Sequence, residues 1–76
     1  MEINSSALKI GQTATILDVN LDEIPLKLLE MGCLPGNTIT LLQIAPLGCP
    51  LYFCVNDAHV AIRLETAKQI SISKDL

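Results

Sequence analysis

Glycine and proline divide this 76-residue chain into short segments, and their spacing limits what it can fold into more than any other feature. The longest uninterrupted apolar stretches are only a few residues, far below the ~20 that a helix needs to cross a bilayer. We therefore expect one small domain of short elements, without direct insertion into a membrane. The breaking residues are Gly11, Pro25, Gly32, Pro35, Gly36, Pro46, Gly48 and Pro50.

One segment has the apolar spacing of a helix, with intervals of four and three residues. Asp22 is suited to cap its amino end, and Pro25 is tolerated in a first turn. Gly32 can take the left-handed conformation that closes a last turn. We predict a helix of about two turns that ends before Gly32 and whose apolar face is Ile24, Leu28 and Met31.

Elsewhere the apolar pattern has a period of two, as in β-strands. The pattern changes phase between Leu41 and Leu42, which predicts a bulge or a strong bend. Asn56 and Asp57 both tolerate positive φ and predict a tight turn between two strands. The predicted strands are residues 12–19, 38–44, 51–55, 59–63 and 70–73, and residues 65–68 predict one helical turn.

Five short strands, with one short helix inserted after the first strand, indicate a mainly β protein. We expect a small closed or nearly closed antiparallel barrel, because closure hides the sheet edges of so short a chain. Residues 1–76 form one domain in this interpretation. We expect residues 1–6 and 74–76 to be only loosely anchored.

Charge and composition exclude several kinds of partner. The net charge is −3, the five basic residues are scattered, and aromatic residues make up only 3% of the chain. Nucleic-acid binding needs clustered cations and stacking platforms, so we do not expect it.

The first residues have no basic start and no apolar run, so we expect no signal peptide and a cytoplasmic location. Three cysteines at irregular spacing do not make a disulfide framework, which agrees with that compartment.

The sequence predicts no catalytic residues. His59 is the only histidine and lies just past the predicted turn, at an exposed strand end. A general base must lie within hydrogen-bonding reach of a nucleophile. Cys33 follows the predicted helix, at the carbonyl end of the helix dipole, which disfavours a thiolate. The glycines are isolated, without a phosphate-binding motif, so we expect no nucleotide or other cofactor.

Three thiols and one imidazole are nevertheless ligand types of a zinc or ferrous centre. No two cysteines form a C-x-x-C pair, and two cysteines five apart in an extended segment point to opposite faces. We therefore expect small buried or half-exposed thiols and no metal site. A small Fe²⁺- or Zn²⁺-binding protein remains the alternative, with the candidate ligands Cys33, Cys49, Cys54 and His59.

Two restricted loops, residues 31–36 and 45–50, combine proline and glycine with apolar side chains that we expect to be exposed. The loops either only turn corners or present a preformed apolar patch to a partner, at little cost in ordering entropy. The candidate partner-binding residues are Met31, Cys33, Leu34, Pro35, Pro46, Leu47 and Gly48.

Three motifs, in order along the chain, resemble the FeoA proteins, small cytosolic components of bacterial ferrous iron transport. Residues 28–36 (Leu-Leu-Glu-Met-Gly-Cys-Leu-Pro-Gly) resemble their Leu-x-x-Met-Gly-Leu-x-Pro-Gly pattern, and residues 45–50 resemble their Ala-Pro-Leu-Gly-Asp-Pro loop. Residues 60–67 are similar to Ala-Leu-Arg-x-x-x-Ala. Cys33 replaces the usual leucine and Cys49 the usual aspartate, which removes an acid from the second loop.

The resemblance implies an SH3-like β-barrel. It also implies a non-enzymatic accessory or regulatory protein that binds the cytoplasmic region of FeoB, the membrane GTPase transporter, at the inner face of the membrane. The same fold occurs as a domain of metal-dependent repressors, so a partner of such a repressor is another alternative. A leftover apolar face would also allow a homo-oligomer.

Overall fold

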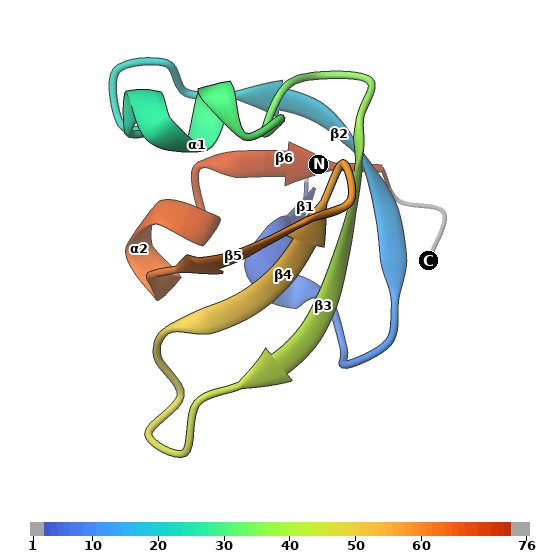
Figure 1. The fold of residues 1–76 in the computed structure, drawn as a ribbon, viewed down its shortest axis with the longest axis vertical. Helices are drawn as coiled ribbons and strands as arrows, with labels where there is room; N and C mark the ends of the chain where they lie inside the picture. The colour runs from blue at the N-terminus through green and yellow to red at the C-terminus, as the bar shows by residue number, and fades with distance from the viewer. Residues whose placement is uncertain (1–2, 74–76) are drawn as a thin grey trace.

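The computed structural model describes residues 3–73, which form six strands, two short α-helices and one 3-10 helix (Figure 1). The expected mainly β fold with an inserted helix is confirmed. The strand count is six rather than five, because the sequence analysis missed the two-residue strand β1. In chain order the elements are β1 (Ile3–Asn4), η1 (Ser5–Ala7), β2 (Thr13–Val19), α1 (Leu26–Glu30), β3 (Thr38–Ile44), β4 (Leu51–Val55), β5 (Ala58–Ile62), α2 (Leu64–Ala67) and β6 (Ile70–Ile72).

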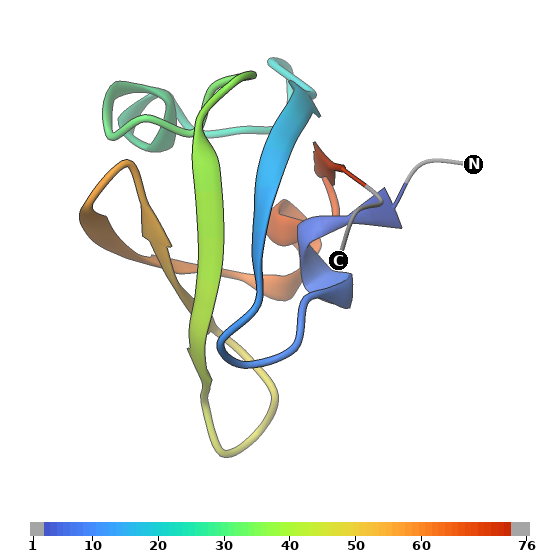
Figure 2. The same cartoon turned by 90° about the vertical axis from the view of Figure 1, so that its right-hand side faces the viewer.

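All neighbouring strands are antiparallel, in the order β1-β6-β2-β3-β4-β5. The register of β2 against β6 shifts between Ile16 and Asp18. Such a bulge bends a strand, and here it lets the first half of β2 pair with β3 and the second half with β6. The sheet therefore curls strongly around its core (Figures 1 and 2). Within residues 3–73, no pairing joins β1 to β5, so the sheet stays open there.

The predicted bulge in β3 is confirmed. The register against β4 shifts between Leu41 and Gln43, at the position where the apolar pattern changes phase. Leu41 is buried, whereas Leu42 is 40% exposed. One strand thus covers the core with its first half and exposes apolar side chains with its second.

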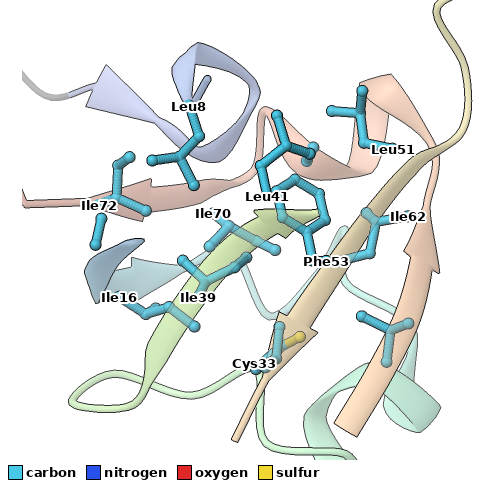
Figure 3. Packing of buried hydrophobic residues seen from close by; sticks show 14 of the residues in the cluster. Leu8, Ile16, Cys33, Ile39, Leu41, Leu51, Phe53, Ile62, Ile70 and Ile72 are labelled. Atoms are coloured by element: carbon cyan, nitrogen blue, oxygen red, sulfur yellow. The ribbon is translucent and has the colours of Figure 1, made fainter. Parts of the chain in front are cut away.

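Alternate residues of the strands face inward and form one continuous hydrophobic core (Figure 3). Phe53 lies at its centre and has no exposed surface. Its neighbours across the sheet are Leu41 on β3 and Val60 on β5. Burying side chains of this size contributes about 1.5–3 kcal/mol each. Other core residues with 1% exposure or less are Ile16, Cys33, Ile39, Leu41, Val55, Ile62, Ala67, Ile70 and Ile72.

The helix α1 starts later than predicted. Its N-cap is Pro25, without a side-chain hydrogen bond, so the expected cap at Asp22 was wrong. The reason is a turn before the helix: the backbone carbonyl of Asn20 accepts hydrogen bonds from Glu23 and Ile24, at 2.9 and 3.0 Å. Asp22 lies inside that turn. With five residues in α1 and four in α2, no helix of the described chain is long and apolar enough to span a membrane.

The segment before β2 is bound to the sheet. Ile3 pairs with Ile72, and the buried Ser5 donates a hydrogen bond from Oγ to the carbonyl of Ala67, at 2.6 Å. The expectation of loose anchoring was therefore wrong for residues 3–6. The same expectation covered positions 1, 2 and 74–76, which lie outside the described residues.

Candidate partner-binding site

The first candidate loop leaves α1 through a Schellman motif, which determines where Cys33 points. The N–H of Gly32 donates to the carbonyl of Leu29 at 3.1 Å, and the N–H of Cys33 donates to that of Leu28 at 3.0 Å. This motif places the second residue after the cap against the apolar face of the helix. The prediction that Gly32 closes the last turn of the helix is confirmed. The assignment of Cys33 to a partner surface was wrong, because its side chain is 0% exposed.

Gly32 also joins α1 to the β4–β5 hairpin. Its φ is +108°, and a Cβ added there would lie 2.8 Å from the Cβ of Asn56. Asn56 and Asp57 both have positive φ, 50° and 64°, which confirms the predicted tight turn. The end of α1 therefore rests directly on this hairpin, and the helix is held beside β5.

The rest of the first loop presents apolar side chains on a fixed backbone. Leu34 is 42% exposed, Pro35 is exposed, and Met31 is half-buried. The side-chain amide of Asn37 donates from Nδ2 to the carbonyl of Gly32 at 2.8 Å and so ties the two ends of the loop together. A partner that contacts Leu34 finds it already positioned.

The second candidate loop places Leu47 at its tip, where it is 96% exposed. The N–H of Ala45 donates to the carbonyl of Pro50 at 3.1 Å, and the N–H of Gly48 donates to that of Ala45 at 2.8 Å. Pro46 and Gly48 are exposed beside Leu47. The loop is thus a closed turn that carries one large apolar side chain in solvent.

Cys49 holds this second loop against α2. Its Sγ accepts a hydrogen bond from the N–H of Leu64, the first residue of the helix, at 3.3 Å. An open hollow of about 570 Å³ lies at this junction and is lined by Cys49, Pro50, Arg63, Leu64 and Glu65. The hydrogen bond to Leu64 accounts for the position of Cys49, and no second cysteine takes part in this contact.

The two loops do not form one patch. They stand at opposite ends of β3, because one precedes this seven-residue strand and the other follows it (Figures 1 and 2). At about 3.4 Å per residue the ends of such a strand lie roughly 20 Å apart. Leu34 and Leu47 are therefore separate candidate contacts, and the idea of a single patch formed by both loops needs this correction.

The four candidate metal ligands do not converge either. Cys33 lies in the core, where burial raises the pKa of its thiol. Cys54 and His59 are cross-strand partners on β4 and β5, half-buried and exposed respectively. Cys49 lies in the loop before β4, near the end of that strand that is far from Cys54 and His59. Within residues 3–73, no group of three or more histidine, cysteine, aspartate or glutamate side chains could hold a metal ion.

Sequence reasoning missed two hollows, one on each side of β5. The first, of about 280 Å³, lies between β5 and the α1 side chains Lys27, Leu28 and Met31. The second, of about 370 Å³, lies on the other side of β5, where Leu42 and Tyr52 line it. The alternating pattern of β5 predicts a strand but not its neighbours, so it gave no sign that β5 is the last strand of the sheet, beside a helix.

Comparison with known proteins identifies the family. The FeoA domain family model matches residues 6–74. The chain belongs to the FeoA family. A fused Fe(2+) transport protein A and Fe(2+) transporter FeoB of Porphyromonas gingivalis is 40% identical over 68 residues, which are 88% of this chain and 8% of that protein. The chain thus spans less than a tenth of the length of this curated relative.

Solved FeoA structures share the fold. Iron(II) transport protein A from Clostridium thermocellum superposes with a TM-score of 0.80 and 31% identity, over 93% of this chain and 44% of that one. FeoA of Stenotrophomonas maltophilia, an SH3-domain protein solved with zinc, superposes with a TM-score of 0.79 and 25% identity, over 93% and 89%. The expected SH3-like fold and family resemblance are confirmed. The family is one of small non-catalytic accessory domains.

Proposed function

We propose that this FeoA protein is a non-enzymatic accessory protein of ferrous iron uptake that binds the cytoplasmic region of a FeoB-type transporter. The observation that carries the proposal is the relative in which Fe(2+) transport protein A and FeoB are one chain. Fusion keeps two partners at a high effective concentration. Where the two are not fused, an FeoA domain needs a binding surface for FeoB to reach the same arrangement at the inner face of the membrane.

Such a protein acts by binding two states of the transporter with different affinities. A ligand shifts an equilibrium only by its differential affinity, and a tenfold difference corresponds to about 1.4 kcal/mol. Stiff loops suit this role, because little conformational entropy is lost when they dock. The first loop offers Met31, Leu34 and Pro35, and the second offers Pro46, Leu47 and Gly48, as two separate contacts.

The test measures the affinity of the purified protein for the cytoplasmic region of a FeoB-type transporter. Leu34→Asp and Leu47→Asp each place a charge where an apolar contact is expected. Leu17→Asp is the matched control, because Leu17 is 52% exposed on β2, outside both loops. We expect at least a tenfold loss of affinity in one or both loop variants and none in the control.

Two results would contradict different parts of this proposal. Wild-type protein that does not bind the transporter at all rules out the proposed function. Wild-type binding that both loop variants retain leaves the function standing and rules out the loops as the contacts. Thermal unfolding of each variant shows whether its fold is intact.

A further inference from the structure

The strand β5 has one side of its backbone without a partner strand. It stands last in the sheet and, within residues 3–73, pairs only with β4. A two-residue turn makes the flanking pair, Val55 and Ala58, a hydrogen-bonded pair, and bonding then alternates along the hairpin. The N–H and C=O groups of His59 and Ala61 consequently point away from β4, to the side of β5 that has no partner strand.

The β5 edge carries none of the residues that usually protect an exposed strand, and α1 lies beside it across the hollow that Lys27, Leu28 and Met31 line. Natural edges carry lysine, proline or a bulge, or are covered by another segment. β5 reads Ala-His-Val-Ala-Ile, and its register with β4 is continuous over five pairs. Its open side is therefore a regular template for one more strand.

The surroundings of β5 suit an added strand. Successive side chains of a strand point to opposite faces, so an incoming segment sends alternate side chains into the two hollows that flank β5. One hollow has the apolar wall of Leu28 and Met31, and the other that of Leu42 and Tyr52. Main-chain hydrogen bonds then give affinity, and the hollows give specificity.

Charge indicates what the incoming segment carries. Lys27 lines the hollow beside α1, together with apolar residues and His59, and no carboxylate lines it. Within the described chain, Lys27 forms no ion pair. A carboxylate on the added segment would complement it. The β5 strand of a second copy has no acidic residue, so pairing edge to edge would not supply one.

We propose that the β5 edge takes up an extended, carboxylate-bearing segment of the transporter as an added strand, with the carboxylate beside Lys27. This inference rests on the proposed function and adds the place and the mode of binding. Met31 belongs to both the first loop and this hollow, so the two contacts are neighbours.

The first test removes one outward N–H. Ala61→Pro deletes a donor that β4 does not use, and proline is tolerated on an edge strand with its nitrogen toward solvent. Ala61→Ser is the matched control, which keeps the N–H at the same exposed position. We expect Ala61→Pro to weaken binding to the transporter's cytoplasmic region at least tenfold and Ala61→Ser to leave it within twofold. Thermal unfolding compares the two folds.

The second test reverses the charge and remains decisive if Ala61→Pro does not fold. We expect Lys27→Glu to weaken binding more than Lys9→Glu, an equal change of net charge at an exposed residue outside the hollow. The difference should shrink as salt is added. If the wild type binds and both Ala61→Pro and Lys27→Glu bind as strongly, this inference is overturned and the proposed function stands. Absence of wild-type binding overturns the proposed function and the inference with it. Self-association that Ala61→Pro abolishes, seen by sedimentation, identifies a second copy as the occupant and overturns the inference.

Discussion

Replacing Gly32 by alanine tests how α1 is joined to the β4–β5 hairpin. The φ of +108° is costly for a residue with a Cβ, by roughly 1–3 kcal/mol. The added Cβ would lie 2.8 Å from that of Asn56, and relieving such overpacking costs about 1–3 kcal/mol more. The sum, about 2–6 kcal/mol, is a large part of the ~4–11 kcal/mol typical of a domain this size. A loss of 3 kcal/mol lowers the Tm by about 20 °C.

Gly36→Ala separates the two contributions. Its φ is +96°, but a Cβ there meets nothing within 4 Å, so this variant carries backbone strain alone. Urea unfolding with an unchanged m-value measures the free energy of unfolding of both variants. We expect Gly32→Ala to lose about 1–3 kcal/mol more than Gly36→Ala, and Asn56→Gly to recover most of this difference in the double variant. Equal losses in the two alanine variants, or no recovery, would refute the reasoning.

Three further predictions concern buried groups. Ser5→Ala should lower the free energy of unfolding by about 1–3 kcal/mol, because it leaves the buried carbonyl of Ala67 without its hydrogen bond; urea unfolding measures this, and an unchanged midpoint would contradict the role given to Ser5. Burial raises the pKa of the Cys33 thiol above its ordinary value. As pH rises through the ordinary thiol range, the unfolded chain therefore loses this proton first, and the free energy of unfolding falls by at most ~1.4 kcal/mol per pH unit until the folded thiol ionises. Cys33→Ala should remove this part of the slope in denaturation series from pH 8 to 10, and an unaltered slope would assign it to other groups. Alkylation of the native protein, followed by mass spectrometry, should modify Cys49 well before Cys33, since only the former is exposed; equal rates would mean that the Schellman loop is open in solution.

Much of the fold was predictable because local chemistry determines it. Gly32 directly after an apolar helix face, Asn56 and Asp57 between two strands, and the change of phase at Leu42 each act within a few residues. The structure confirms all three features. Positions with an unusual backbone conformation can be recognised in the sequence, because only a few residue types adopt such a conformation readily.

The errors concern contacts between distant parts of the chain. Ser5 is fixed by Ala67, 62 residues away, and a run of small polar residues gives no sign of such a partner. The start of α1 depends on the turn at Asn20. The N-cap is therefore Pro25, although the side chain of Asp22 is better suited to cap a helix. Local preference is a weak guide wherever a distant or competing hydrogen bond is available.

The candidate site was predictable only in part. The exposure of Leu34 and Leu47 follows from apolar residues in proline–glycine loops, and burial of Cys33 could have been read from an apolar residue that follows the closing glycine. The β3 strand between the loops already implied that they lie apart. The edge position of β5 and its hollows arise from the sheet order, which alternation does not encode.

Amide hydrogen exchange with and without the transporter's cytoplasmic region tests the central claim most directly, because it reports the docking surface without any substitution. The account predicts slower exchange where α1 meets β5, with His59 and Ala61 gaining protection as their N–H groups acquire partners. Unchanged exchange at both residues, in a sample where the complex is shown to form, would contradict it.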